Sequence, residues 1–561
     1  MTFDVRTMFD EQRLVDMTVN EIIENRADAL SDDIAIHYGE METDVTYGEL
    51  NRIANAVGYG LVDLGIEKGD RVSVMVRDHL ETLFAMFGIH KTGGLYSPIN
   101  WAYRGDTLSY QINDTRPEVL IIEDQYLDRL NAVLDDLEER PTVVVLNTDA
   151  DSDPPDGYET TSFATLKDAP STKPDVDLSW DDDLCIIYTS GTTGMPKGVV
   201  LSHRYPQAGF TGYFYNFLTR EDTVHSIAPL YHIGALYVLV MPALISGAEL
   251  ALWNKPSVSE FWDRIEMYDV TFAGVPEPVV AWLMNQPEQP DDHENTLNKL
   301  FIQPLPKQYE DVANRYGFEY LFVGFGQTES GYPVQGIVAP TDEAHGTPEA
   351  YRLGLSRAEI GQRAEDLGIS LLNEAPDTGY LGTHWRDETV DLAVLNDRDE
   401  RVKPGAVGEL AIRPNKPGVI MNRYFGKPER TVEEWSNLWF HTGDAVYRDN
   451  ADNFFFVDRI DDVIRRRGEN ISSIQLQDIV NKHDTINRSA AFPIEDEYGQ
   501  EDKVAIAVEP LEDAELSPAD LEGFFERELP EFMQPKHIMV LDELPSTQTG
   551  KIEKYKLRDR V

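Results

Sequence analysis

Apolar residues follow two alternating spacings in the first third of the chain. One spacing is helical and predicts amphipathic helices over residues 47–64 and 79–92. The other is a continuous apolar run, typical of strands buried on both faces of a parallel sheet, over residues 71–76, 119–122 and 142–146. The same alternation returns after residue 220. Strands and helices in this order predict the α/β fold class with doubly wound sheets.

The chain has 561 residues, too many for one hydrophobic core, so several domains are expected. Residues 147–183 are acidic and rich in Pro, Ser and Thr, which predicts a surface linker. Residues 345–377 are charged and contain a helical segment. A boundary is predicted near Asp461. It separates a large N-terminal domain (residues 1–458) from a small α+β C-terminal domain (residues 459–561).

The most informative stretch lies between two apolar strands, 184–187 and 199–201. It reads Thr189, Ser190, Gly191, Thr192, Thr193, Gly194, Met195, Pro196 and Lys197. Glycines let backbone N–H groups approach an anion, hydroxyls donate hydrogen bonds and a lysine adds positive charge, so this loop suits a polyphosphate. Its spacing differs from that of a P-loop, so it is a phosphate loop of another kind. The alternative is an ordinary hydrophilic hairpin connection, but a turn of that kind does not require so many hydroxyl residues.

The composition is strongly acidic. There are 100 Asp and Glu residues against 49 Lys and Arg, which gives a net charge of -51. Because these carboxylates are dispersed along the chain, they oppose binding to nucleic acid and to anionic membranes. Salt relieves their mutual repulsion, so we predict a halophilic protein that needs high salt. An acidic partner-binding surface is the alternative, although such a surface concentrates its charge in one segment.

Three features bear on the cellular location. The single cysteine, Cys185, excludes an intrachain disulfide and permits a reducing interior. The first residues lack the basic and apolar runs of a signal peptide. The most membrane-like stretch, 234–253, is interrupted by Pro242 and Glu249, which predicts a buried helix and strand and no integral membrane segment. We therefore expect a cytoplasmic protein.

Four further segments follow the loop in a fixed order. They are Gly-Phe-Gly-Gln-Thr-Glu at 324–329, Trp-Phe-His-Thr-Gly-Asp at 439–444, a long segment at 458–472, and Leu-Pro-Ser-Thr-Gln-Thr-Gly-Lys-Ile at 544–552. Together with the loop they resemble the adenylate-forming superfamily of acyl-CoA synthetases, luciferases and peptide-synthetase adenylation domains. The resemblance covers nearly the whole chain. It implies a β-barrel-like part in the N-terminal domain and a mobile C-terminal domain.

The resemblance implies an ATP site. Residues 189–197 would hold the β- and γ-phosphates, Thr328 would bond the α-phosphate, and Glu329 would ligate Mg²⁺, a hard cation suited to oxygen ligands. Asp444 would accept both ribose hydroxyls, and Arg459 would also reach the ribose. The other nucleotide contacts that it implies are Gly324, Phe325, Gly326 and Gln327. Phe325 stands where the family usually has a tyrosine, so stacking on adenine survives while a hydroxyl is lost.

The resemblance also assigns the reacting groups. Lys551 would bridge the acyl carboxylate and the α-phosphate as they meet, and a surface lysine in a tail is the plain alternative. His232 matches the family's position beside the acyl carboxylate, although a lone histidine in an apolar stretch is more often a core residue. Asp461 occupies the hinge position about which the C-terminal domain would rotate. The residues expected at the CoA channel are Arg467, Gly468 and Glu469.

The leading interpretation is an ATP-dependent acyl-CoA synthetase that uses ATP, CoA, Mg²⁺ and a small carboxylic acid. Residues 467–471 resemble the CoA-ligase branch, and residues 423–429 resemble the medium/long-chain and carnitine/crotonobetaine ligases. The expected pocket walls are apolar and aromatic, which favours a non-polar acid. The alternatives are a free-standing adenylating enzyme that transfers the acyl group to a carrier protein, and a nucleotide-binding regulator without turnover. A homodimer is compatible with each of these.

Overall fold

The chain folds into two compact units. The computed structural model describes residues 14–148, 160–189, 195–210, 214–342, 344–377, 379–385, 389–466, 469–495, 502–511, 514, 516–531, 533–546, 552–558 and 560–561. The first unit takes the described residues of 1–190, 195–391 and 414–433, and the second takes those of 392–413 and 434–561. The boundary predicted near Asp461 lies inside the second unit and stays a prediction.

One sheet of the first unit carries the strands on either side of the predicted phosphate loop. Its order is β20 (Arg423–Tyr424), β9 (Lys197–Ser202), β8 (Asp183–Thr189), β4 (Leu95–Pro98), β3 (Arg71–Met75), β5 (Val119–Glu123), β6 (Thr142–Leu146) and β7 (Thr160–Ser162). The pairs from β8 to β7 are parallel, whereas β8–β9 and β9–β20 are antiparallel. The apolar runs therefore form central parallel strands, as predicted from their lack of polar positions.

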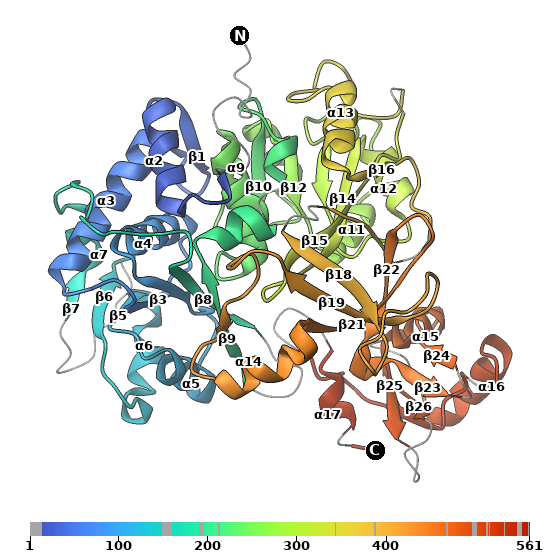
Figure 1. The fold of residues 1–561 in the computed structure, drawn as a ribbon. Coiled ribbons are helices and arrows are strands. Elements are labelled where there is room, and N and C mark those ends of the chain that lie inside the picture. Colours follow the sequence, from blue (N-terminus) through green and yellow to red (C-terminus); the bar gives the residue numbers. More distant parts are fainter. Residues whose placement is uncertain are drawn as a thin grey trace. The chain divides into compact units, whose positions relative to one another are not determined.

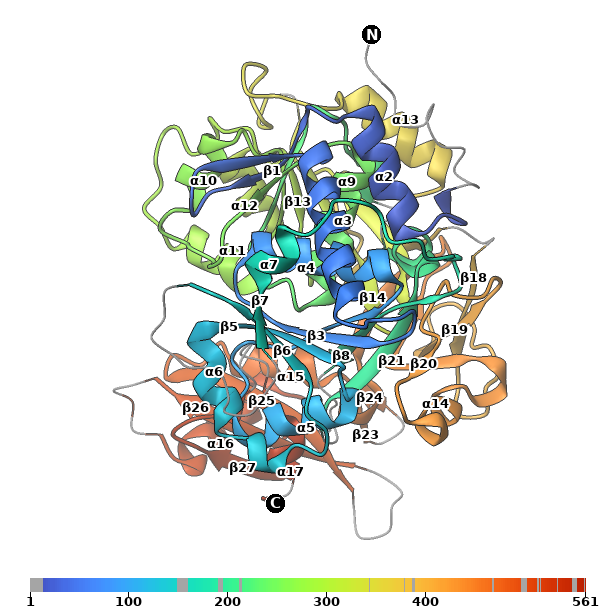
Figure 2. The same ribbon diagram turned by 90° about the vertical axis from the view of Figure 1, so that its left-hand side faces the viewer.

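Helices cover both faces of this sheet (Figures 1 and 2). One face carries α3 (Tyr47–Asp63), α4 (His79–Thr92) and α7 (Phe163–Lys167), and the other carries α5 (Gly105–Thr115) and α6 (Leu127–Asn131). Leu108 of α5 and Leu130 of α6 pack against Leu120 of β5 in one buried cluster. On the opposite face α3 and α4 cross closely, because a Cβ at Gly58 would lie 2.9 Å from the backbone oxygen of Gly88.

A second sheet completes the first unit. Its order is β2 (Thr43–Thr46), β1 (Ile34–Tyr38), β11 (Glu249–Leu252), β10 (Thr223–Ser226), β12 (Phe272–Gly274), β13 (Lys299–Phe301), β14 (Tyr320–Gln327), β15 (Gly331–Val338) and β17 (Tyr380–His384), with β16 (Ser370–Leu372) also paired to β15. The strands from β1 to β14 are parallel neighbours, and β14–β15 is an antiparallel hairpin. That hairpin turn carries Thr328 and Glu329.

The helices around the second sheet include α2, which packs beside α3 (Figure 2). They are α2 (Val19–Ala29), η6 (Gly234–Val240), α9 (Met241–Ser246), α10 (Phe261–Met267), α11 (Glu277–Met284), α12 (Tyr309–Tyr316) and α13 (Arg357–Leu367). Short turns and the helix that leads into the second unit are η2 (Asp124–Tyr126), η3 (Leu134–Asp136), η4 (Pro206–Phe210), η5 (Tyr215–Phe217) and α14 (Pro428–Glu434). The two sheets share one helical layer, since the Tyr47 hydroxyl of α3 donates to the Ala248 carbonyl beside β11 at 2.6 Å.

The second unit combines an antiparallel sheet with a small α+β part. The antiparallel strands are ordered β18 (Val390–Leu395), β19 (Gly408–Pro414), β21 (Phe440–Arg448) and β22 (Asn453–Arg459). The expected barrel-like part stays a prediction. The elements that follow are η7 (Ser436–Leu438), η8 (Ile460–Asp462), β23 (Ile464–Arg466), β24 (Glu469–Ile471), α15 (Ser473–Val480), β25 (Ile486–Glu495), β26 (Asp502–Pro510), α16 (Pro518–Glu528), β27 (His537–Val540) and α17 (Lys554–Arg558).

Successive side chains of β26 face two different buried clusters of this α+β part. Ile506 and Val508 join a buried cluster with α15 and α16, whereas Ala505 and Ala507 face a second cluster that contains Leu557 of α17. Successive side chains of a strand point to opposite faces, so one strand supplies both clusters.

The predicted α/β class, with a large and a small part, is confirmed. The helix over 79–92 and the strand over 142–146 have the predicted bounds. The membrane-like stretch 234–253 is confirmed as a buried helix and strand. The linker over 147–183 was wrong in part, because β7 pairs with β6 and Phe163 and Leu166 of α7 are buried. The segment is polar overall, but a short helix buries its two apolar side chains.

Candidate active site

The stems of the predicted phosphate loop form an antiparallel pair. Thr189 on β8 lies opposite Lys197 on β9, and Tyr188 lies opposite Gly198. The loop residues between them, Ser190, Gly191, Thr192, Thr193 and Gly194, lie outside the described residues. The hairpin therefore brings the first hydroxyl and the lysine of the motif to one end of the sheet.

Side chains from α5 hold these stems. The Tyr110 hydroxyl donates to the Pro196 carbonyl at 3.0 Å, and the Tyr188 hydroxyl donates to Asp114 at 2.9 Å. Asp114 also forms an ion pair with Lys427. Burial beside the Asp114 carboxylate raises the pKa of Tyr188 above its usual value, so the phenol stays a hydrogen-bond donor.

The β14–β15 turn brings Glu329 to the same stems. The Thr189 hydroxyl lies 3.4 Å from Oε1 of Glu329, and the Tyr424 hydroxyl donates to that oxygen at 3.0 Å. The turn itself is fixed through its backbone, because the Tyr205 hydroxyl donates to the Thr328 carbonyl at 2.6 Å and the Met421 amide donates to the Glu329 carbonyl at 2.8 Å. Two motifs that are 140 residues apart thus meet at one carboxylate.

Close packing against Tyr332 explains why glycines precede this turn. A Cβ at Gly326 would lie 2.2 Å from the Tyr332 ring, and one at Gly324 would lie 2.5 Å from it. No side chain fits there, whatever else these glycines contact. Phe325 is buried and pairs with Val334 across the hairpin, while Gln327 is half-buried. The adenine contacts assigned to these residues stay predictions.

His232 lies in the turn before η6. Its ring is exposed to solvent, and its Nδ1 accepts the Gly234 amide at 3.1 Å. Desolvation by the surrounding protein lowers the pKa of His232, although the ring surface is accessible. The accepted hydrogen bond is the firmer sign of a neutral ring, since only an unprotonated Nδ1 can accept it. The remaining ring nitrogen, Nε2, then carries the proton.

Cys185 takes no part in this chemistry. It is fully buried on β8, and burial raises the pKa of its thiol to about 12. Its Sγ lies 3.3 Å from the Tyr237 hydroxyl. The predicted role as a small core residue matches this placement.

In the second unit, Asp444 and Arg459 are cross-strand partners on β21 and β22. Arg459 Nη1 donates to Asp444 Oδ1 at 2.8 Å, and the Asp444 side chain is almost wholly buried. The turn before Asp444 needs Gly443, whose φ is +70°, a conformation that strains other residues. Thr442 anchors this turn by donating from its hydroxyl to the Leu410 carbonyl at 2.7 Å.

Glu409 holds the same turn and had not been singled out from the sequence. One of its oxygens accepts the Gly443 amide at 2.9 Å, and the other lies 2.8 Å from His441 Nδ1. The signal in the sequence is a glutamate directly before the apolar run 410–412. The carboxylate orients the turn that presents Asp444.

The predicted hinge lies in η8 of the second unit. The Asp461 carbonyl accepts Arg558 Nη2 at 2.7 Å, and Asp462 forms an ion pair with the same guanidinium. Lys551, Arg467 and Gly468 lie outside the described residues, and Glu469 begins β24. The assignments of these four residues stay predictions.

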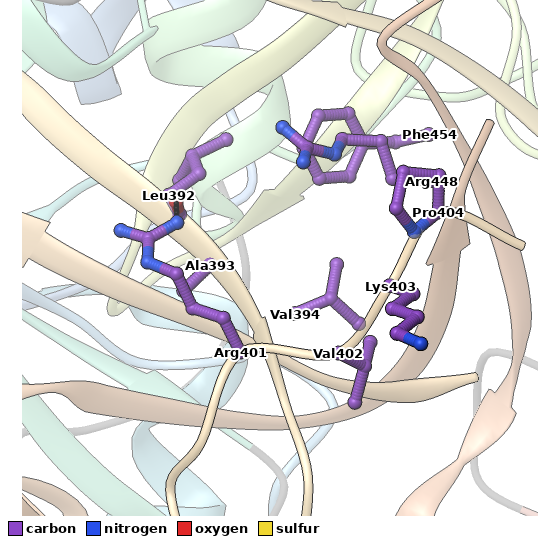
Figure 3. Close-up of a pocket in the computed structure, with 9 residues that line it drawn as sticks. All are labelled: Leu392, Ala393, Val394, Arg401, Val402, Lys403, Pro404, Arg448 and Phe454. Carbon is purple, nitrogen blue, oxygen red and sulfur yellow. Dashed lines mark hydrogen bonds between the residues drawn. The ribbon is translucent and has the colours of Figure 1, made fainter. Parts of the chain in front are cut away.

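A small cavity in the second unit lies beside β18 and β21 (Figure 3). It measures about 30 Å³, the room of one water molecule, and is lined by Val394, Arg401, Lys403 and Phe454 among others. The charged ends of Arg401 and Lys403 point in different directions in Figure 3. The two cations therefore do not converge in this cavity.

The carboxylate of Glu329 fits a magnesium ion. Across the described part of the chain, no three His, Cys, Asp or Glu side chains gather into a metal cage. Mg²⁺ is commonly held by one or two carboxylates together with substrate phosphates, so Glu329 next to the phosphate-loop stems is a suitable ligand.

None of the helices in the described ranges has the length and apolar character required to span a bilayer.

Comparison with known proteins gives family matches over most of the chain. The model of the AMP-binding enzyme family matches residues 23–425, and that of the AMP-binding enzyme C-terminal domain matches residues 475–551. A crotonobetaine/carnitine–CoA ligase of Salmonella enteritidis is 28% identical over 522 residues, covering 91% of this chain and 93% of the relative. The corresponding ligase of Salmonella typhi is 29% identical over 519 residues, covering 91% of each chain.

Solved structures share the fold. The chain superimposes on an anthranilate CoA ligase in complex with anthranoyl-AMP with a TM-score of 0.78, at 20% identity, covering 98% of this chain and 99% of that one. It also resembles the O-succinylbenzoate coenzyme A synthetase of Bacillus subtilis in complex with ATP and magnesium ion, with a TM-score of 0.73, at 19% identity, covering 96% and 99% of the two chains.

Proposed function

Because this chain belongs to the AMP-binding enzyme family and is an AMP-forming acid–thiol ligase, we propose that it joins a non-polar carboxylic acid to CoA at the expense of ATP. In the first half-reaction a carboxylate oxygen bonds to the α-phosphorus of ATP, and the bond to pyrophosphate breaks. In the second the CoA sulfur bonds to the acyl carbon, loses its proton and releases AMP. The observation that carries this proposal is the meeting of Thr189 and Glu329 at the phosphate-loop stems.

The first half-reaction concentrates negative charge on the phosphates, so cations and oriented donors dominate catalysis. In this proposal residues 189–197 hold the β- and γ-phosphates, and Thr328 donates to the α-phosphate. Glu329 would hold Mg²⁺, which supplies positive charge to the phosphate oxygens when bound. Asp444, with Arg459 beside it, accepts the ribose hydroxyls. Lys551 bridges the carboxylate and the α-phosphate.

The second half-reaction requires a change of reacting groups at one site. In this proposal the chain rotates about Asp461, which withdraws Lys551 and presents Arg467, Gly468 and Glu469 to CoA. His232 orients the acyl carboxylate, and its exposed ring with a protonated Nε2 suits that role.

A non-polar acid suits the surroundings of His232 better than a betaine. Next to His232, Tyr231 packs edge-on against Trp101, with ring centroids 6.4 Å apart. An aromatic pair of this kind can bind a quaternary ammonium through cation–π contact. Here the Arg77 guanidinium already lies over Trp101 at 5.1 Å, so a trimethylammonium would meet a like charge. A crotonobetaine-like acid, the substrate named for the relatives, is the second candidate.

The test is ATP–pyrophosphate exchange in high salt with fatty, aryl and betaine acids. We expect exchange with a fatty or aryl acid and stoichiometric AMP release once CoA is added. If only betaine acids support exchange, the substrate is a crotonobetaine-like acid and not a non-polar acid. Activity with a holo-carrier protein but not with CoA would instead support a free-standing adenylating enzyme. Absence of AMP and pyrophosphate with every acid would support a nucleotide-binding regulator. A cytoplasmic location, a homodimer and a halophilic character remain part of this proposal.

A further inference from the structure

Tyr424 contacts both charged groups of the phosphate-loop site. Its hydroxyl donates to Oε1 of Glu329 at 3.0 Å. The ammonium of Lys197 lies over the face of its ring, 4.9 Å from the centroid, within the range of a cation–π contact. One buried side chain thus connects the carboxylate expected to hold Mg²⁺ with the lysine expected to hold the leaving pyrophosphate.

The backbone around Tyr424 is tied to the same two groups. Tyr424 pairs with Val199 on β9, two residues beyond Lys197, and the next amide, Phe425, donates to the Gly198 carbonyl at 2.8 Å. Three residues before it, the Met421 amide donates to the Glu329 carbonyl at 2.8 Å. The segment therefore places the tyrosine relative to Lys197 and Glu329 through main-chain hydrogen bonds.

The side chain of Tyr424 is also buried. Tyr424 is 3% exposed, and its own amide donates to the Thr431 hydroxyl at 3.0 Å. At Glu329, the Tyr424 and Thr189 hydroxyls approach the same carboxylate oxygen from two strands. Donors that converge on one oxygen restrict the rotation of the carboxylate, which is how neighbouring groups orient metal ligands.

We propose that Tyr424 is a positioning residue that orients Glu329 toward Mg²⁺ and keeps the Lys197 ammonium at the phosphate site. The inference rests on the proposed function. It separates two contributions of one side chain: the hydroxyl serves the metal-binding carboxylate, and the ring serves the lysine. Removing the hydroxyl alone should therefore affect only the Mg²⁺-dependent part of ATP binding.

The experiment measures ATP binding by titration calorimetry, without carboxylic acid, across a range of Mg²⁺ concentrations and in EDTA. For Tyr424→Phe we expect the Mg²⁺ concentration that gives half-maximal tightening of ATP binding to rise about 10-fold or more, the size typical for losing a group that orients a metal ligand. Binding in EDTA should stay as in the unchanged protein. Tyr424→Leu, which also loses the ring, should weaken ATP binding in EDTA as well.

Two controls separate positioning from general destabilisation. Tyr47→Phe removes another buried tyrosine hydroxyl, which donates to the Ala248 carbonyl, and should leave the Mg²⁺ dependence unchanged. The double variant Tyr424→Phe with Glu329→Gln should be no weaker in Mg²⁺ than Glu329→Gln alone, because the hydroxyl acts through that carboxylate. Thermal melting of each variant verifies that it is folded.

The outcomes distinguish this inference from the proposed function. An unchanged Mg²⁺ dependence in Tyr424→Phe, or an equal rise in Tyr47→Phe, overturns the positioning role while ATP binding by the unchanged protein still supports the ligase. A failure of the unchanged protein to bind ATP in any condition overturns both.

Discussion

Arg459 donates from Nη1 to the buried carboxylate of Asp444 at 2.8 Å, directly across the β21–β22 pair. This charge-assisted hydrogen bond fixes the orientation of the carboxylate. The residues thus act as one unit, and a change in either alters the other.

Asp444→Asn should raise the KM for ATP about 10- to 100-fold, because one hydrogen-bonding charge is lost from a nearly buried site. ATP–pyrophosphate exchange over a range of ATP concentrations measures this effect. Asp452→Asn is the matched control, since Asp452 is exposed and pairs only loosely with Arg448 at 3.2 Å on the same hairpin. Equal KM values for both variants would contradict a role for Asp444 at the ribose.

Lys551→Ala should abolish acyl-adenylate formation while the variant still converts a supplied acyl-adenylate and CoA to the thioester. The reason is that the lysine charge is needed only while the carboxylate and the α-phosphate meet. Pyrophosphate exchange and thioester formation are measured separately. Lys556→Ala, which removes an exposed lysine paired with Glu553, should retain both activities. Normal exchange in Lys551→Ala would refute the assignment.

Asp461→Pro should slow thioester formation more than adenylation, because proline fixes φ at the point where the chain would rotate. Asp461→Ala provides the comparison, since alanine removes the carboxylate and leaves φ free. Single-turnover rates for each half-reaction supply the measurement. A hinge at this position is excluded if proline slows both half-reactions to the same extent.

Potassium chloride should stabilise the protein by screening its net charge of -51. We expect Tm to rise by several degrees between about 0.1 M and about 3 M KCl, because the Debye length falls from about 10 Å to below about 3 Å. Circular dichroism during heating measures Tm, with sucrose of equal osmolality as the control for exclusion effects. A rise in sucrose as large as in KCl would point away from charge screening.

His37 should make stability depend on pH. Burial by itself lowers the pKa of His37, but hydrogen bonds to Glu249 at 2.8 Å and Asp44 at 2.6 Å outweigh it and raise the pKa above its ordinary value. A raised pKa in the folded state means that the stabilisation is fully present below the unfolded pKa of about 6.5 and is lost as pH rises through the folded pKa.

The corresponding variant is His37→Gln. It should lose about 1–3 kcal/mol of unfolding free energy at about pH 5.5 and less at about pH 9, as measured by chemical denaturation. His345→Gln is the control, because His345 forms a similar pair with Asp342 on an exposed surface. A loss for His37→Gln that is independent of pH would show that the ring is not charged in the fold.

The sequence by itself determined the local elements and the identity of the motifs. Periodicity places one face of α3 or both faces of β5 in the core, and that information is local, so helix and strand bounds followed closely. Exceptions arose where composition and burial disagree, as in α7, whose Phe163 and Leu166 stand in an otherwise polar segment.

Tertiary structure decided which distant residues meet. Glu329 contacts Thr189 and Tyr424, which are 140 and 95 residues away, because the β14–β15 turn, the β8–β9 stems and β20 converge in the first unit. Glu409 likewise became a partner of Gly443 only through the pairing of β19 with β21. Sheet order sets these contacts, and hydrophobic spacing within one element carries no information about its neighbours in the sheet.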